Sequence, residues 1–208
     1  MKNIIYEQIN IDNIKFIIFD FDDTLYDYTN SNQKSWEAIF SKLNFYDNIK
    51  EIFELARQNV KKIHHNTALE HDKVIQIKEL FRLLNIKDTK LLQEIINTYY
   101  NTFYKNVKLF DGWINFFDKC KEHNIIMVIL TNNTFFNQLQ LFNQLQLYKY
   151  FDNIFTSYEI GYEKPHIKCF QYIHNIYNFD KEHILMIGDS HNTDALGAIN
   201  FGIRYFII

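Results

Sequence analysis

Glycine, proline and cysteine are scarce in this chain. Its 208 residues include 5 Gly, 1 Pro and 2 Cys. Cys120 and Cys169 lie far apart in the sequence and outside any CxxC spacing, so neither a disulfide framework nor a zinc site is indicated, and both are expected to be buried thiols. Because Gly and Pro are so few, the positions that carry them are expected to need their backbone geometry.

Long hydrophobic runs and an excess of positive charge are also missing. The longest strongly apolar run, 125–130, is far too short to cross a bilayer, and residues 1–15 contain no continuous apolar segment of the signal-peptide type. With 22 Lys and Arg against 25 Asp and Glu, the formal net charge is -3, which argues against binding to nucleic acid or to a membrane surface. These absences predict a cytoplasmic protein that must bind any phosphate group locally.

Apolar residues make up 47% of the chain, enough for a globular core. Three short continuous apolar runs, at 16–19, 125–130 and 184–187, predict buried strands. Helical patterns between them indicate a parallel sheet covered on both faces, as in a Rossmann-like α/β fold. The helical patterns lie at 113–121 and 167–177, and weaker strand patterns lie at 153–156 and 205–208.

The segment between the first two strong strands has a different period. Its apolar residues recur at intervals of three and four residues, which predicts four amphipathic helices and hence a small helical bundle. We therefore divide the chain into an α/β core, residues 1–28 and 108–208, and a helical unit, residues 29–107. The four apolar stripes lie at 36–43, 49–63, 74–84 and 92–103.

Each strong strand is followed directly by polar residues, at 20–24, 131–133 and 188–190. In an open parallel sheet, ligands bind beyond the carboxyl ends of the strands, so these clusters are expected to meet in one crevice. Several carboxylates packed together repel one another, and a divalent cation is the usual means of holding them. Ligands that are all oxygen favour Mg²⁺ over zinc.

The residues of this crevice suit phosphoryl transfer, in which catalysis consists mostly of positioning and charge stabilisation. Asp20, at a strand end, is the candidate nucleophile that would form an aspartyl-phosphate. Asp22 emerges on the same side of the extended chain and is the candidate general acid and base. Thr131 and the backbone amides that follow it, beginning with Asn132, are candidates for binding phosphate oxygens, and Lys164 for neutralising their charge.

Two conformationally special residues flank these candidates. Pro165 is the only proline and directly follows Lys164; we expect it in the first turn of the next helix, where it would fix the direction of Lys164. Gly188 permits a tight turn before Asp189.

Other side chains near these segments have less specific interpretations. Tyr26 and Tyr28 either line a substrate entrance or pack in the core. Phe135 and Phe136 are expected in the core. His191 is expected near the rim of the crevice, and no role is assigned to it.

Taken together, four segments of the sequence resemble the motifs of the haloacid dehalogenase (HAD) superfamily. FIIFDFDDTL resembles the first motif, VILTNN the second, GYEKP the third and IGDSHNTD the fourth, in the family's order. The helical unit between the first two is similar to the family's mobile cap, which closes over the active site. The resemblance covers the whole chain and implies a HAD-like α/β core with a helical cap that selects the substrate.

The resemblance also implies roles for individual residues. Asp20 would be the nucleophile and a metal ligand, and Asp22 the acid and base that also binds the metal through its backbone carbonyl. Thr131 and Lys164 would bind the phosphoryl group, and Asp189 would be a ligand of Mg²⁺.

Two further acidic residues fall within the same motifs. Asp194 matches the last acidic position of the family and would orient metal-bound water or Lys164. Asp23 stands where the family often has glycine, and we assign it no catalytic role.

Asp22 distinguishes branches of the superfamily, because dehalogenases typically lack a carboxylate two residues after the nucleophile. The resemblance therefore favours a phosphatase acting on a small phosphorylated metabolite, of the nucleotide or sugar phosphate type. A phosphomutase, a 2-haloacid dehalogenase and a non-catalytic binding protein are the alternatives. A monomer and a homodimer are both compatible with the sequence, since no heptad or long apolar edge argues for association.

Overall fold

The computed structural model describes residues 6–208 of the chain. Its internal contacts form two compact units: one holds the described residues up to Asp27 together with Lys108–Ile208, and the other holds Tyr28–Val107. Within residues 6–208 no helix is long and apolar enough to span a membrane.

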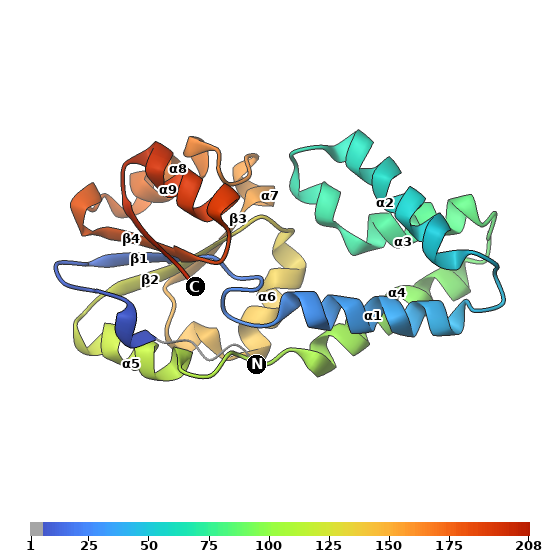
Figure 1. Ribbon diagram of the computed structural model, residues 1–208, viewed down its shortest axis with the longest axis horizontal. Helices are drawn as coiled ribbons and strands as arrows, with labels where there is room; N and C mark the ends of the chain where they lie inside the picture. The colour runs from blue at the N-terminus through green and yellow to red at the C-terminus, as the bar shows by residue number, and fades with distance from the viewer. Residues whose placement is uncertain (1–5) are drawn as a thin grey trace. The chain divides into compact units, whose positions relative to one another are not determined.

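The first unit, called the core unit here, contains a five-stranded sheet (Figure 1). The strand order is β3-β2-β1-β4-β5, and all four pairings are parallel. This arrangement confirms the predicted α/β parallel-sheet fold. The strands are β1 Phe16–Phe19, β2 Ile126–Thr131, β3 Asn153–Thr156, β4 Ile184–Gly188 and β5 Arg204–Ile207.

Helices cover both faces of this sheet, with α8 and α9 on one side and α5 on the other (Figure 1). Because both faces are covered, all residues of the central β1 and its neighbour β4 are buried, which explains their continuous apolar sequences. The helices of the core unit are α5 Trp113–Glu122, α6 Phe135–Gln144, α7 Ser157–Ile160, α8 Ile167–Tyr177, α9 Leu196–Phe201 and the π-helical turn η5 His191–Ala195.

Alternate residues of β1 face opposite layers. Phe16 and Ile18 belong to a buried cluster with residues of α8 and α9, including Phe170 and Phe201. On the other face, the ring of Phe19 makes edge-on contacts with several aromatic rings, an arrangement that the ring quadrupoles favour. These rings belong to Trp113, Phe116, Phe117 and Phe151, at centroid distances of 5.5, 6.2, 5.7 and 5.3 Å. The carboxyl end of β1 is therefore anchored from both sides.

The second unit, called the helical unit here, consists of four helices in which α1 packs against α4 and α2 against α3. Trp36 of α1 lies at the centre, with ring centroids 4.0 Å from Phe53 of α2 and 5.1 Å from Tyr99 of α4. The helices are α1 Tyr28–Lys42, α2 Ile49–His64, α3 Lys73–Leu83 and α4 Thr89–Asn106, with a 3₁₀ turn at Ala68–His71.

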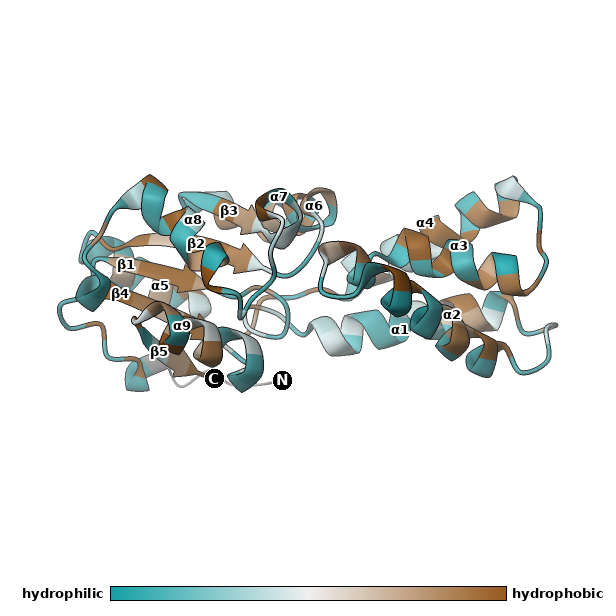
Figure 2. Ribbon diagram, turned by 90° about the horizontal axis from the view of Figure 1, so that it is seen from above, coloured by the Kyte–Doolittle hydropathy of each residue, from teal (hydrophilic) through white to brown (hydrophobic). Residues whose placement is uncertain are grey.

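Aspartate side chains cap the N-termini of two of these helices, α3 and α4. The side chain of Asp72 accepts a hydrogen bond from the Ile75 N–H, and that of Asp88 accepts from the Lys90 and Leu91 N–H groups. Each cap satisfies backbone donors that have no partner within the helix. Hydropathy differs between the two kinds of element. Figure 2 shows strands that are largely hydrophobic and helices that carry both hydrophobic and hydrophilic residues.

Two expectations from the sequence are wrong. Pro165 does not lie in the first turn of a helix: α8 begins at Ile167 with His166 as its N-cap, so Pro165 lies in the turn before it. Phe135 and Phe136 are not in the core, since they are 39% and 68% exposed. They stand at the start of α6, whose buried face is set by residues further along the helix.

Candidate active site

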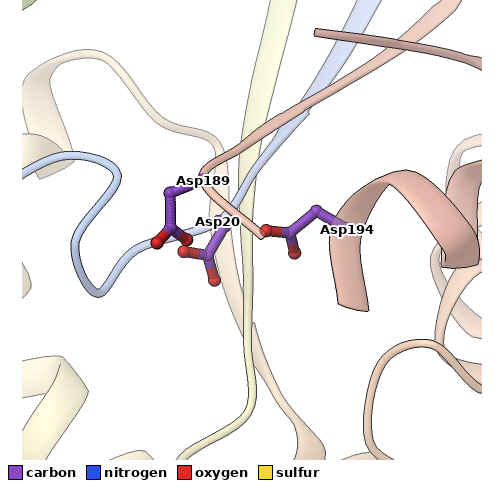
Figure 3. Close-up of side chains that lie close together, drawn as sticks. All are labelled: Asp20, Asp189 and Asp194. Atoms are coloured by element: carbon purple, nitrogen blue, oxygen red, sulfur yellow. The ribbon is translucent and has the colours of Figure 1, made fainter. Parts of the chain in front are cut away.

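Three acidic side chains meet at the carboxyl ends of β1 and β4 (Figure 3). Carboxylate oxygens of Asp20, Asp189 and Asp194 all lie within 4.8 Å of one another. Asp20 follows β1 directly, Asp189 follows β4, and Asp194 belongs to η5. The direction of the strands thus brings together residues that are distant in the sequence.

The backbone after β1 folds back on itself. The Asp20 N–H still donates to the Ile187 carbonyl, at 2.8 Å, which keeps Asp20 in register with β4. Asp23 has φ 59°, in the left-handed region, where Asp is better tolerated than most residues. This turn directs Thr24 back toward Asp20, and the Thr24 hydroxyl donates to Asp20 Oδ2 at 2.7 Å. Asp23 therefore shapes the loop that follows β1.

Thr24 is itself held in place. The indole N–H of buried Trp113 donates to the Thr24 carbonyl at 2.9 Å. The Thr24 Oγ also lies 3.4 Å from Asp189 Oδ1. Thr24 therefore connects the two strand ends and fixes one oxygen of Asp20.

Lys164 lies between two carboxylates and is only 3% exposed. Its Nζ is 2.6 Å from Asp20 Oδ1 and 2.7 Å from Asp194 Oδ1. Charge-assisted hydrogen bonds of this length are strong, and a buried lysine requires such partners. The second oxygen of Asp194 accepts from the Ser190 N–H at 3.1 Å, so both Asp194 oxygens are engaged by the protein.

A reciprocal pair of hydrogen bonds fixes the backbone of Lys164. The Lys164 N–H donates to Asn132 Oδ1 at 2.8 Å, and Asn132 Nδ2 donates to the Lys164 carbonyl at 2.9 Å. The short helix α7, which precedes Lys164, is capped at both ends. A capping box between Thr156 and Glu159 begins it, and Gly161, whose φ of 79° suits glycine, ends it. The side chain of Asn132 thus orients Lys164 rather than projecting freely into the crevice.

Gly188, the last residue of β4, leaves room for Asp194. A Cβ at this position would lie 2.2 Å from Asp194 Oδ2 and 2.4 Å from its Cγ. Both distances are far below van der Waals contact, so only glycine permits the observed position of Asp194. The scarcity of glycine in the sequence is consistent with this requirement.

The local charges change the acidity of Asp20 and Lys164. Burial raises the pKa of the Asp20 carboxyl group to about 7; the Lys164 ammonium opposes this rise, and the carboxylates of Asp194 and Asp22 add to it. Burial alone would lower the pKa of Lys164, but Asp194 and Asp20 outweigh it and hold that pKa above its ordinary value. Lys164 is therefore a cation at neutral pH, and further positive charge near Asp20 would lower the pKa of its carboxyl group.

Asp22 has a different set of partners from the acidic cluster. Its carboxylate accepts hydrogen bonds from the Tyr26 hydroxyl, from Asn133 Nδ2 at 3.1 Å, and from Gln138 Nε2 at 3.2 Å to Oδ1 and 3.1 Å to Oδ2. Tyr26 is fully buried, so of the two interpretations of this residue the structure shows the packing one, with its hydroxyl directed at Asp22.

The donor set at the strand ends suits a magnesium ion. Carboxylate oxygens are the ligands that Mg²⁺ prefers, and Asp20 and Asp189 present them beside each other without any nearby His or Cys ligand in the cluster. The raised pKa of Asp20 is what uncompensated negative charge and burial produce, and a cation would relieve it. Asp194, engaged by Lys164 and Ser190, is suited to orienting the site rather than to direct ligation.

The remaining candidates from the sequence take clear positions. Thr131 is the last residue of β2 and is buried, and Asn132 follows it. His191 opens η5 with an exposed side chain. Lys164 thus contacts Asp20 and Asp194 directly, and the carboxylate of Asp189 lies within 4.8 Å of theirs. Asp22 and Asn132 have their own hydrogen-bonding partners.

Three residues at the site are absent from the set that the sequence predicts: Thr24, Asn133 and Gln138. Thr24 and Asn133 belong to two of the polar clusters that follow the strands, at 20–24 and 131–133. Their position in these clusters is the sequence feature that could have identified them as site residues. Gln138 lies in α6, five residues beyond the nearest of those clusters, and nothing in the local sequence marks it as part of the site.

Comparison with known proteins agrees with this geometry. Residues 17–208 match the haloacid dehalogenase-like hydrolase family. A glyceraldehyde 3-phosphate phosphatase of Methanothermobacter thermautotrophicus is 24% identical over 94% of this chain and 85% of its own length. A ribulose-1,5-bisphosphate 5-phosphatase of Halopiger xanaduensis is 25% identical over 90% of this chain and 82% of its own.

A solved structure shows the same fold. The magnesium-bound HAD-hydrolase YfnB of Bacillus subtilis superimposes with a TM-score of 0.70 at 23% identity, over 94% of this chain and 88% of that one. The family match, the four sequence motifs and the parallel sheet agree, and the resemblance seen in the sequence is confirmed: this chain belongs to the haloacid dehalogenase-like hydrolases.

Proposed function

We propose that this protein is a Mg²⁺-dependent phosphatase that hydrolyses a small phosphomonoester, of the sugar phosphate or nucleotide type, through an aspartyl-phosphate. The observation that carries the proposal is the setting of Asp20. It is a buried carboxylate at the end of the central strand, held by Lys164 and Thr24 and beside Asp189. The phosphatase names of two relatives support the same class of reaction.

In the first half of the proposed reaction, an oxygen of Asp20 attacks the phosphorus of the ester. The bond between phosphorus and the leaving oxygen breaks, and Asp22 donates the proton that this oxygen takes up. Lys164, permanently charged, balances the negative charge of the phosphoryl oxygens while keeping its hydrogen bond to Asp194. Thr131 and the backbone N–H of Asn132, at the end of β2, bind the phosphoryl oxygens.

In the second half, Asp22 takes a proton from water as the water oxygen attacks the same phosphorus. The bond between phosphorus and Asp20 breaks, which restores the Asp20 carboxylate and releases inorganic phosphate. Asp22 then carries the proton that it needs for the next substrate. The two halves use the same groups in reverse order, as the two proton transfers require.

Asp20 and Asp189, together with the backbone carbonyl of Asp22, would hold the cation. When bound, Mg²⁺ supplies positive charge that favours the ionised form of Asp20 and stabilises the charge of the transferring group. Asp194 contributes indirectly, by fixing Lys164 and the backbone of Ser190. Magnesium in the structure of the Bacillus subtilis relative supports this choice of metal.

The helical unit is proposed to act as the cap that selects the substrate. This unit contains a pocket of its own, of about 470 Å³, between α1, α2 and α3. Aromatic and charged side chains line it together, including Trp36, Phe53, Arg57 and Lys73. Such a mixture is suited to a polar metabolite with a planar or apolar part. The names of two relatives point to sugar phosphates as the class of substrate to test first.

The test is steady-state release of phosphate by the full-length protein from a panel of sugar phosphates, nucleotides and p-nitrophenyl phosphate. We expect turnover with Mg²⁺, none with EDTA, and none in Asp20→Asn. Absence of turnover on every ester would overturn the proposal. Halide release from 2-halo acids would instead indicate a dehalogenase, isomerisation that needs a bisphosphate activator would indicate a mutase, and binding without any reaction would indicate a non-catalytic protein.

A further inference from the structure

One buried side chain near the site has no role in the reaction proposed for this protein. Gln138, on α6, is 1% exposed, and its Nε2 lies 3.2 and 3.1 Å from the two oxygens of Asp22. We propose that Gln138 is a positioning residue that holds the Asp22 carboxylate in the orientation needed for proton transfer to the leaving oxygen. This inference rests on the proposed phosphatase function and on the role of Asp22 in it.

The orientation of the Gln138 amide is fixed by chemistry. When Asp22 is ionised, both of its oxygens can only accept, so the NH₂ group of the amide must face them. The amide oxygen, Oε1, then points the other way, and it is buried without a hydrogen-bond partner. A buried acceptor without a partner costs about 1–3 kcal/mol. A methionine or leucine would fill this volume without that cost, so packing alone does not account for a glutamine here.

The other two donors to Asp22 come from different parts of the core unit. Tyr26 lies in the loop after β1, and Asn133 lies in the loop after β2. With Gln138 from α6, three neutral donors hold the carboxylate, and within residues 6–208 no cation forms an ion pair with it. Neutral donors orient a carboxylate without pairing it with a positive charge, in contrast to Lys164, which holds Asp20 by an ion pair.

Loss of the Gln138 amide would remove one of the three donors that hold Asp22, the one that contacts both of its oxygens. Asp22 is half-buried, and without Gln138 the other two donors reach only one oxygen each. Tyr26 then holds Oδ1 and Asn133 holds Oδ2, so the carboxylate keeps two hydrogen bonds instead of four and is held less firmly in its orientation. A proton donor that is misplaced by even a fraction of a hydrogen-bond length contributes less to the reaction.

This role has a kinetic signature that a merely structural role lacks. A general acid matters most when the leaving oxygen is a strong base and least when it is a weak one. Phenoxide is a much stronger base than p-nitrophenolate, whereas phenyl phosphate and p-nitrophenyl phosphate have the same shape around phosphorus. Misplacement of Asp22 therefore slows the hydrolysis of phenyl phosphate more than that of p-nitrophenyl phosphate.

The experiment compares Gln138→Met with Gln140→Met, a matched change at an exposed position of the same helix. For each protein with Mg²⁺, kcat and KM are measured on phenyl phosphate and on p-nitrophenyl phosphate. The ratio of kcat/KM values, phenyl over p-nitrophenyl, reports phosphoryl transfer from the ester and not hydrolysis of the aspartyl-phosphate that both esters share. We expect this ratio to fall by roughly tenfold in Gln138→Met, a part of the roughly 10²–10⁴-fold that a general acid contributes, and to stay unchanged in Gln140→Met. Asp22→Asn gives the upper limit of the effect.

Folding is monitored by urea unfolding of the same preparations. Methionine removes an unpartnered buried oxygen but also the hydrogen bonds to Asp22, and these two effects are of similar size, so Gln138→Met is expected to unfold at a urea concentration close to that of the wild type. Gln138→Leu, which removes the same donor with a different shape, must show the same loss of the ratio.

Equal losses of kcat/KM on both esters in Gln138→Met and Gln138→Leu, or no loss on either, would overturn the inference while leaving the phosphatase intact. A wild type that hydrolyses neither these esters nor any ester of the wider panel would overturn the proposed function, and the role of Gln138 with it. The two failures are therefore distinguished by the wild-type measurement alone.

Discussion

Gly188→Ala tests whether the close approach of β4 to Asp194 organises the site. The added Cβ would lie 2.2 Å from Asp194 Oδ2, 2.4 Å from Cγ and 2.7 Å from Cβ. Because three side-chain atoms of Asp194 are involved, rotation about one bond does not relieve the overlap. Asp194 must move, and its hydrogen bonds with Ser190 and Lys164 must lengthen or break.

The cost can be worked out from these contacts. Insertion of a methyl group into a filled site costs about 1–3 kcal/mol through strain. A hydrogen bond to a charged group, such as that from the Ser190 N–H, adds about 1.5–3 kcal/mol. If Lys164 also loses Asp194, a buried charge is left with one partner instead of two, but Asp20 still compensates it. The expected loss of unfolding free energy is therefore about 2.5–6 kcal/mol, much of the total stability of a typical domain.

Gly202→Ala is the matched control. Gly202 has φ 83°, and no neighbouring atom lies within 4 Å of the position that a Cβ would take, so alanine there costs only backbone strain, about 1 kcal/mol. Urea unfolding of both variants measures the difference, and phosphate release measures the effect on activity. We expect Gly188→Ala to be the less stable by at least about 1.5 kcal/mol and to lose activity. Equal stabilities, with activity kept in both, would refute the reasoning about Asp194.

Three further predictions concern the hydroxyl beside Asp20, a buried thiol and the cation. Thr24→Val keeps the shape of Thr24 but removes the hydroxyl that donates to Asp20 Oδ2. We expect kcat to fall and the unfolding free energy to fall by about 1.5–3 kcal/mol. An unchanged kcat would contradict the role of this hydroxyl. Burial raises the pKa of Cys120 from 9.0 to about 12, so the protonated thiol contributes fully to stability below pH 9, and this contribution is lost as pH rises toward 12. Between pH 8 and pH 10, the unfolding free energy of the wild type, measured with urea, should fall by about 1 kcal/mol more than that of Cys120→Ala. Equal falls in the two proteins would be inconsistent with a buried thiol. Mg²⁺ at 100 times its Kd should stabilise the wild type by about 2.7 kcal/mol in thermal unfolding and should do so far less in Asp189→Asn; the same gain in both would place the cation elsewhere.

The central strands could be predicted from the sequence because a strand that is buried on both faces has a continuously apolar sequence. β1 and β4 are buried along their whole length, and their residues are continuously apolar. The edge strands β3 and β5 gave weaker patterns, since Asn153, Arg204 and Tyr205 are exposed. Their pairing depends on neighbours in the sheet rather than on their own composition.

The meeting of Asp20 with Asp189 followed from strand direction alone, because parallel strands end at the same edge. The orientation of individual side chains did not follow. The clamp between Asn132 and the Lys164 backbone joins two loops 32 residues apart, and the contact of Gln138 with Asp22 spans 116 residues. No local pattern encodes such pairs, which exist only once the sheet has formed.

Helix α6 shows why apolar composition alone did not predict which of its residues are buried. Its buried face is set by Gln138, Leu141 and Phe142, so a polar residue lies inside while Phe135 and Phe136 lie outside. A hydrophobic residue at the start of a helix is buried only if the rotation of that helix, fixed by its other contacts, turns it inward. Here the contact of Gln138 with Asp22 is one of those that fix the rotation.

The most direct test of the account is to capture the phosphorylated enzyme. Asp22→Asn lacks the group that activates water but needs no acid to release p-nitrophenolate, so with Mg²⁺ and p-nitrophenyl phosphate its aspartyl-phosphate should persist. After an acid quench and proteolysis, mass spectrometry is expected to find one phosphoryl group on the peptide that contains Asp20, located at Asp20. Release of p-nitrophenol with no phosphoryl group on the protein, or with one on a different residue, would contradict the account.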